Sequence, residues 1–242
     1  MDYVVMDPWH APAGSEHQFS EKVLRLPHSR FCFQPIDDAP EAAPLPPVAT
    51  RESITFGSFS NVAKINDQVI GAWSRILMGV AHSRLLLKWR TLADGKCRDR
   101  LASRFQQAGI DPARIEMRGQ SDHAEMLGQY AGVDIALDTF PFTGGQTSFE
   151  ALWMGVPVVS RAGHRAVSRQ TLCMLGNLGL EGLAEDSEDG FVDRAVALAR
   201  DVPRLRDLRL SLRQKMMSSP LMRAPEFTQA FLSALRSAGG AV

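Results

Sequence analysis

Short apolar runs alternate with longer amphipathic segments from residue 54 onward, and this alternation constrains the fold more than any other feature. The apolar runs have the length of buried strands and lie at 54–58, 85–87, 115–117, 133–137 and 156–159. Strands that alternate with helices form parallel sheets covered on both faces, so the pattern predicts a Rossmann-like α/β fold. Right-handed crossovers bring the carboxyl ends of such strands to one edge, where ligands bind.

The amphipathic segments between these runs are predicted to be helices. Asn66 and Asp122 are residue types that cap helices, and apolar residues follow them at helical spacing. We predict helices over 66–80, 96–107, 122–130, 146–154, 168–178, 189–201, 203–217 and 224–237. The arginines of the later helices are expected to lie on a solvated face; they are Arg204, Arg206, Arg209 and Arg213.

Prolines mark a boundary near the N-terminus. Residues 35–48 contain five prolines, which exclude a helix and favour an extended linker over 35–50. Residues 1–34 offer a strand at 3–6, a turn of helix at 19–24 and a strand at 31–33. These elements are too few to form a core, so we expect this segment to pack on something else, with residues 51–242 as the main lobe.

Charge and cysteine content exclude several functional classes. Lys+Arg and Asp+Glu both number 27, so nothing favours a general nucleic-acid or membrane surface. Three cysteines without a CxxC pair predict neither a disulfide framework nor a zinc site, and they fit a reducing cytoplasm. No apolar run reaches the roughly 18 residues of a membrane span.

A glycine-bearing turn after the fourth apolar run carries the clearest sign of chemistry. Thr143, Gly144 and Gly145 form a loop without bulky side chains, and Gln146 and Thr147 then open a helix. Helix N-termini carry unpaired N–H groups and partial positive charge, which suits a phosphate. Glu150, about one turn further along, could reach a ribose hydroxyl. The residues alone leave two readings open, namely a nucleotide-diphosphate site or an ordinary strand-to-helix turn.

Two other loops should reach the same edge of the sheet. Asn61 and Lys64 follow the strand at 54–58, and a lysine there suits a pyrophosphate leaving group. His123 sits in the first turn of the helix after the strand at 115–117, where it could contact a ligand. Taken singly, a solvated lysine and a capping-turn histidine are the alternative readings.

Several of these runs resemble the C-terminal catalytic lobe of O-GlcNAc transferases from the bacterial branch with tetratricopeptide repeats. The similar runs are 59–64, 138–139, 144–150 and 151–159. Residues 1–7 and 19–27 are similar to the tail of the family's N-terminal catalytic lobe, and 218–221 also matches. The resemblance implies the C-terminal half of a GT-B glycosyltransferase plus C-terminal helices, with 1–34 as a remnant of the N-terminal lobe.

The resemblance also implies an activity, which is inverting transfer of GlcNAc from UDP-GlcNAc to Ser/Thr of a protein acceptor without a metal or other cofactor. By position, Lys64 is the catalytic residue that stabilises departing UDP, and His123 lies beside the uridine. The nucleotide-sugar site comprises Asn61, Lys64, His123, Thr143, Gly144, Gly145, Gln146, Thr147 and Glu150. Gly145 and Gln146 depart from the family, which has His or Thr and then Thr there, so backbone donors should carry more of the phosphate contact.

The acceptor-side residues and the repeats of the family do not appear in this sequence. We therefore expect the chain to be a fragment or a shortened reading frame that packs against an N-terminal lobe. Two alternatives stay open, namely a non-catalytic UDP-binding module that needs such a partner and a related transferase that attaches glucose to Asn. The expected compartment is the cytoplasm.

Overall fold

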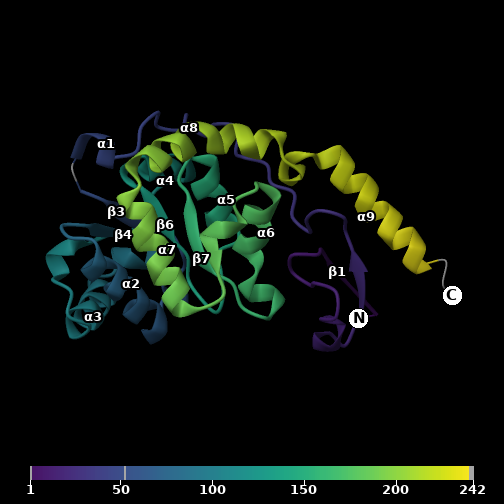
Figure 1. Cartoon of the computed structure of the whole chain (residues 1–242), viewed down its shortest axis with the longest axis horizontal. Helices are drawn as coiled ribbons and strands as arrows, with labels where there is room; N and C mark the ends of the chain where they lie inside the picture. The colour runs from purple at the N-terminus through teal and green to yellow at the C-terminus, as the bar shows by residue number, and fades with distance from the viewer. Residues whose placement is uncertain (1, 52, 240–242) are drawn as a thin grey trace.

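The computed structural model describes residues 2–51 and 53–239. Three stretches lie outside the described residues, namely Met1, Glu52 and residues 240–242. Met1 is the first residue of the predicted N-terminal segment, and residues 240–242 are the last of the predicted main lobe. A six-stranded sheet of order β5-β4-β3-β6-β7-β8 forms the centre, and every pair in it is parallel (Figure 1). The strands are β3 (Thr55–Ser58), β4 (Arg84–Lys88), β5 (Ile115–Arg118), β6 (Ile135–Leu137), β7 (Val158–Arg161) and β8 (Ala184–Glu185). The predicted parallel sheet is confirmed.

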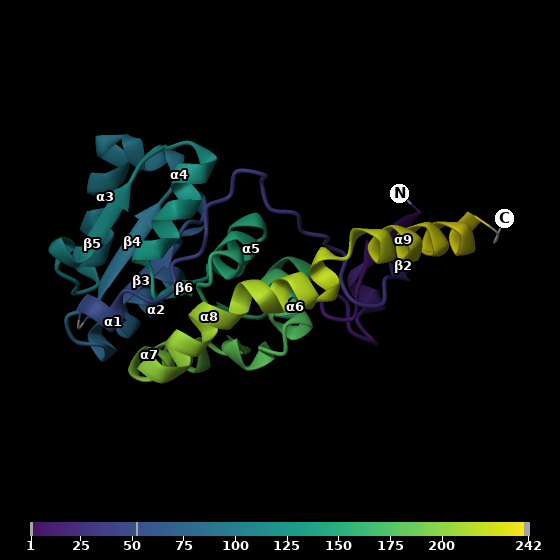
Figure 2. The ribbon, with the colours of Figure 1, turned by 90° about the horizontal axis from the view of Figure 1, so that it is seen from above.

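From residue 67 onward the helices follow the strands in the predicted alternation. The short helix at 48–51 differs from the prediction of an extended linker over 35–50, because it begins directly after the last proline of that segment. The helices are α1 (Val48–Arg51), α2 (Asp67–Gly79), α3 (Gly95–Gln107), α4 (His123–Gly128), α5 (Gln146–Trp153), α6 (Gln170–Asn177), α7 (Glu188–Arg200), α8 (Val202–Ser218) and α9 (Ala224–Gly239). The predicted caps are present, since Asn66 Oδ1 accepts from Val69 N and Asp122 Oδ1 from Glu125 N. Seen from above, α5 and α7 lie on opposite sides of the strands (Figure 2).

The strand order fixes where a ligand can bind. The chain builds β3, β4 and β5 in one direction along the sheet and then returns to place β6 on the other side of β3. The connections that leave β3 and β6 therefore diverge toward opposite faces. A crevice opens at such a switch point, outside the carboxyl ends of the strands. The loops after β3 and β6 contain Lys64 and the glycine pair.

In the N-terminal segment the predicted strand at 3–6 is confirmed, but the other two predicted elements are not. Residues 22–25 form β2 (Lys22–Arg25), which pairs in parallel with β1 (Tyr3–Met6), so the predicted helical turn at 19–24 is wrong. The predicted strand at 31–33 is also wrong. Phe33 instead stacks on Phe149 at 4.9 Å between ring centroids, and its N–H donates to Leu221 O. The aromatic side chains of residues 31–33 therefore pack against the main lobe and do not belong to a strand.

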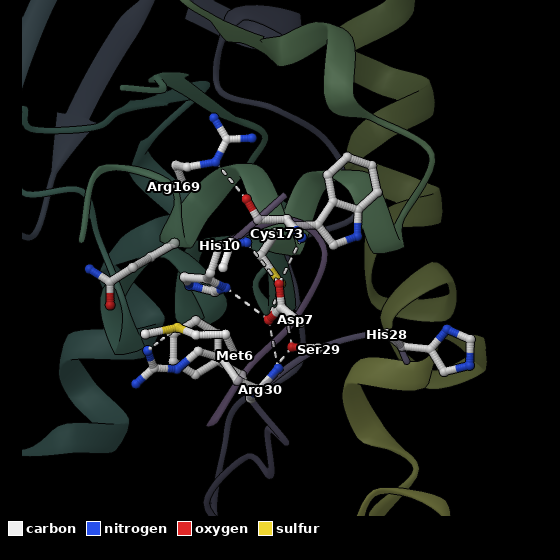
Figure 3. Close-up of polar contacts among 12 residues, drawn as sticks. Met6, Asp7, His10, His28, Ser29, Arg30, Arg169 and Cys173 are labelled. Atoms are coloured by element: carbon white, nitrogen blue, oxygen red, sulfur yellow. Dashed lines mark hydrogen bonds and ion pairs between the residues drawn. The ribbon is translucent and has the colours of Figure 1, made fainter. Parts of the chain in front are cut away.

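A buried carboxylate joins this segment to α6 (Figure 3). Asp7 Oδ2 accepts hydrogen bonds from His10 Nδ1 at 2.8 Å, from Arg30 N at 2.7 Å and from Cys173 Sγ of α6 at 3.4 Å. Its other oxygen accepts from the backbone N–H groups of Trp9 and His10. Burial by itself would raise the pKa of Asp7, but these hydrogen bonds and the charge of His10 hold it below its usual value.

The last helices support the main lobe from outside the sheet. Arg209 of α8 is only 2% exposed, so the predicted solvated arginine face is wrong at this position. Its guanidinium donates to Met154 O at 3.1 Å, to Tyr130 O at 3.5 Å and to Val133 O. Burial lowers the pKa of Arg209 to about 10, although the charge of Asp134 opposes the shift. Arg209 thus bonds three main-chain carbonyls, two in the segment 130–133 and one directly after α5.

Candidate nucleotide-binding site

Lys64 lies at the switch point and reaches across it. A short 3-10 helix (Val62–Lys64) follows β3, and Lys64 Nζ donates to Thr143 O at 3.1 Å. The same nitrogen lies 3.8 Å from the ring centroid of Phe142, a cation–π contact. Burial lowers the pKa of Lys64, and the negative charge of Asp138 partly restores it. The loop after β6 therefore holds a half-buried cation.

Asp138, directly after β6, fixes the shape of the glycine loop. Asp138 Oδ1 accepts from Gly144 N at 2.7 Å, and Oδ2 accepts from the hydroxyls of Ser160 and Thr171, each at 2.6 Å. Burial raises the pKa of Asp138 despite these hydrogen bonds, which act in the opposite direction. A side chain at Gly144 would run into the hydroxyl of Ser148, so this position needs glycine.

The N-terminus of α5 faces the same loop without a side-chain cap. Gly145 is the residue before the helix, and it has no side chain to accept from the first N–H groups. The first turn of an α-helix has no backbone acceptors for these groups. Their N–H dipoles and the partial positive charge of the helix end thus lie beside Lys64. The arrangement suits an anion that carries more than one negative charge.

Glu150, in the second turn of α5, ties the third loop to this site. Its Oε1 accepts from Gln146 Nε2 at 3.1 Å and contacts His123 Nε2 at 2.8 Å. The Glu150 carboxylate is only 5% exposed, while the His123 side chain is 43% exposed. Glu150 therefore has a fixed orientation that leaves Oε2 for another partner.

A cavity of about 310 Å³ opens beside these residues, between the ends of β3, β4 and β5 and the start of α5. Its lining residues are Phe59, Lys88, Trp89, Arg90, Gly119, Gln120, Ser121, Met126, Gln146, Thr147 and Glu150. Tyr130 supports two of the lining residues. Its ring stacks on Phe59 with 4.0 Å between the ring centroids, and its hydroxyl donates to Thr147 O. A mostly apolar cavity with a few convergent polar groups is typical of a small-molecule site.

The structure brings the three predicted loops together, but the residues contribute differently. Asn61 Oδ1 accepts from Ala63 N, so this side chain caps the short helix. Thr143 is fully buried, and its hydroxyl donates to Val167 O at 3.0 Å. Its carbonyl, rather than its hydroxyl, faces Lys64. The side chain of Gln146 donates to Glu150 Oε1. The backbone N–H of Gln146 lies in the first turn of α5 and is the group that it offers to a ligand.

Sequence reasoning missed Lys88 and Trp89, two residues that line the cavity. They lie at and directly after the end of β4. Their position at the carboxyl end of a parallel strand is the signal that could have identified them.

One group of potential metal ligands occurs among the described residues, and it lies apart from the cavity. Asp7, His10 and Cys173 place their ligand atoms within 4.8 Å of one another. The Asp7 carboxylate is already bonded by five donors, as described above, and these contacts hold the N-terminal segment on α6. No helix in the described part of the chain has the length and apolar character needed to cross a membrane.

Comparison with known proteins places this geometry in a family. The profile of glycosyl transferase family 41 matches residues 47–231. The chain is 37% identical over 243 residues to a Solanum lycopersicum protein named probable UDP-N-acetylglucosamine–peptide N-acetylglucosaminyltransferase SPINDLY, covering 98% of this chain and 26% of that protein. It is 29% identical to the SEC protein of the same enzyme name from Arabidopsis thaliana, covering 91% of this chain and 23% of that protein.

The solved structures that this chain resembles include a protein of the same kind as these sequence relatives. A mutant of the Thermobaculum terrenum O-GlcNAc transferase superposes with a TM-score of 0.88 at 33% identity, covering 100% of this chain and 46% of that one. A sucrose-phosphate synthase from Thermosynechococcus elongatus, at 14% identity and a TM-score of 0.62, shares the fold alone. The chain spans about a quarter of the length of the curated relatives named above. The predicted GT-B half and the predicted resemblance are both confirmed, and the chain belongs to glycosyl transferase family 41.

Proposed function

We propose that this chain is the donor-binding half of a transferase that moves GlcNAc from UDP-GlcNAc to Ser or Thr of a protein. The observation that carries the proposal is the convergence of Lys64 and the uncapped N-terminus of α5 on one loop, next to a cavity that ends at Glu150. The names of the relatives support the donor and the peptide acceptor. Tetratricopeptide repeats and a cytoplasmic location belong to the same proposal. The three free thiols support the location, because thiols stay reduced in the cytoplasm.

The chemistry assigned to each residue follows from its position. The diphosphate lies at the N-terminus of α5, where the N–H groups of Gln146 and Thr147 donate to it. Lys64 moves its ammonium from Thr143 O to the phosphate that leaves with UDP, so charge that develops on that oxygen is neutralised. Such preorganised charge stabilises the transition state without a metal or cofactor. Inversion at the sugar carbon requires the Ser or Thr hydroxyl of the acceptor protein to attack from the face opposite UDP, and an N-terminal lobe is needed to hold the acceptor there.

The positions of the ribose and the base follow from this position of the diphosphate. Glu150 Oε2 accepts from a ribose hydroxyl, while His123 and Gln146 hold Oε1. The base enters the cavity between Phe59 and the loop at Gly119. His123 is exposed enough to contact the nucleoside as well as Glu150.

Calorimetric titration with UDP tests the binding site directly. We expect UDP to bind to the chain and Lys64→Ala to weaken binding by about tenfold or more, because a hydrogen bond to a charged group contributes about 1.5–3 kcal/mol. Lys96→Ala is the matched control, since Lys96 is an exposed lysine at the start of α3. Absence of binding at millimolar UDP would disprove the site, and equal affinity of the two variants would remove Lys64 from it.

Transfer assays test the reaction separately from binding. With a peptide acceptor and a matching N-terminal lobe, we expect label transfer from UDP-GlcNAc that Lys64→Ala abolishes. Stronger transfer from UDP-glucose to Asn would instead indicate the related glucosyltransferase. UDP binding with no transfer under any of these conditions would indicate a non-catalytic module.

A further inference from the structure

The cavity beside α5 contains a buried cation that the proposed reaction does not use. Lys88 is the last residue of β4, pairs in register with Arg118 of β5 and is only 5% exposed. It lines the cavity, whose apolar lining residues are Phe59, Trp89 and Met126. A lysine this buried needs a polar partner, because desolvation disfavours the ammonium form.

One partner of Lys88 is a backbone carbonyl. Lys88 Nζ donates to Gly119 O in the loop after β5. The loop packs closely at this point, because a Cβ at Gly119 would lie 2.9 Å from the backbone N and Cα of Ala93. Burial lowers the pKa of Lys88, while the negative charge of Glu125 raises it. An ammonium has three N–H donors and no acceptor, and Gly119 O occupies one of them.

Sheet order places Lys88 at the base end of a bound nucleotide. The phosphate end lies at α5, which follows β6, and β3 separates β6 from β4. Strands are about 4.8 Å apart, so Lys88 lies two strands, or roughly 10 Å, from the loop that holds the diphosphate. Glu150, which faces the ribose in the proposed function, lines the same cavity. The group that meets Lys88 is therefore the nucleobase.

We propose that Lys88 selects the base by donating to a carbonyl oxygen on its edge, so that the site accepts keto bases and rejects amino bases. The inference rests on the proposed function, because it assumes that the cavity holds a nucleotide. Uracil and cytosine separate the two cases, since they have one ring size and differ in a carbonyl acceptor against an amino donor at C4. A buried donor facing an amino group has no acceptor, which makes the wrong base costly.

The test is calorimetric titration of the chain with UDP and CDP. We expect the wild-type chain to prefer UDP by about tenfold or more, and Lys88→Met to bind both within about twofold. Lys96→Met, in which an exposed lysine is removed, should keep the wild-type preference. GDP against ADP gives a second keto-against-amino pair with a larger ring.

A ligand variant keeps the test valid if Lys88→Met does not fold. The nucleotide 4-thio-UDP replaces the C4 carbonyl oxygen by sulfur, a weaker acceptor, and should bind the wild-type chain several-fold more weakly than UDP. Wild-type affinities for UDP, CDP and 4-thio-UDP within twofold of one another would overturn the role of Lys88 and leave the nucleotide site intact. So would a folded Lys88→Met chain that keeps the preference for UDP. Failure of every nucleoside diphosphate to bind would instead disprove the proposed function.

Discussion

Lys64 and Thr143 lie 79 positions apart in the chain, and the ammonium of Lys64 donates to the carbonyl of Thr143 at 3.1 Å. The contact joins the loop after β3 to the loop after β6 across the switch point of the sheet. It holds the lysine with a neutral acceptor, which an anion can replace without leaving a buried charge unpaired. The Thr143 carbonyl also keeps a second donor, Gln170 Nε2 at 3.0 Å.

The lowered pKa of Lys64 predicts how UDP affinity depends on pH. Burial favours the neutral amine, so in the free chain Lys64 loses its proton below the ordinary lysine pKa. A bound diphosphate favours the ammonium. UDP affinity should therefore decrease as the pH rises through the lowered pKa of Lys64, and binding there should take up a proton. Calorimetry in buffers of different ionisation enthalpy measures this uptake, and Lys64→Ala should show none in this range.

Glu150 is expected to contribute to affinity through the ribose. Glu150→Gln replaces one carboxylate oxygen by an amide donor, so UDP should bind about tenfold more weakly. The loss should be smaller for 2′-deoxy-UDP if the 2′-hydroxyl is the partner. Glu181→Gln, at an exposed glutamate after α6, is the control. Equal losses for UDP and its deoxy form, with 3′-deoxy-UDP behaving in the same way, would contradict the ribose contact.

The two neighbouring glycines should respond differently to alanine. At Gly144 a methyl group meets the buried Ser148 side chain, whereas at Gly145 the closest contact is Gln170 Oε1 at 3.5 Å, an ordinary distance. Gly144→Ala should therefore distort the loop and destabilise the fold by about 1–3 kcal/mol, while Gly145→Ala should change stability little. Urea unfolding of the two variants checks this, and similar stabilities would contradict the packing described for Gly144.

Asp138 should contribute to stability through the hydrogen bonds that its two carboxylate oxygens accept. Asp138→Asn keeps an oxygen for the N–H groups of Gly144 and Thr139, and its amide can donate to the hydroxyls of Ser160 and Thr171. Asp138→Ala leaves these donors without a partner, at a cost of about 3 kcal/mol or more. Chemical unfolding at neutral pH should give Asp138→Asn a clearly larger free energy of unfolding than Asp138→Ala. The reverse order would contradict the hydrogen bonds described for Asp138.

The pKa shifts of Asp138 and Asp7 have opposite signs and predict opposite pH effects. The raised pKa of Asp138 favours the folded protonated form, so its contribution is complete below about pH 3.9 and is lost as the pH rises through the folded value. The lowered pKa of Asp7 gives a contribution that is present above about pH 3.9 and is lost as the pH falls through the folded value. Unfolding of Asp138→Asn and Asp7→Asn against pH, each compared with the wild type, should show these two trends.

Periodicity was sufficient for the centre of the main lobe because β3, β4, β6 and β7 are mostly buried along their length. The loops after β3, β5 and β6 could be placed at one edge for the same reason. Periodicity missed the short edge strand β8, whose two residues are only half-buried. In the N-terminal segment the strand at 3–6 could be predicted, but residues 31–33 could not. Phe31 and Phe33 have strand-forming side chains that the fold uses for packing on Phe149 and Trp153. Lys88 carries no local signal apart from its place at a strand end, since a buried lysine cannot be distinguished from a solvated one by pattern.

The buried Arg209 also bears on the order in which the chain can acquire its site. Its guanidinium bonds the carbonyl of Tyr130, whose ring and hydroxyl support Phe59 and Thr147 at the cavity. All the proposed ligand-binding residues precede residue 151. Tyr130, which supports the cavity, nevertheless gains its bond to Arg209 only when α8 has packed. During synthesis the ribosome must therefore release residue 209 before the nucleotide cavity is complete. A nascent chain shorter than this would contain every contact residue and still lack its finished pocket.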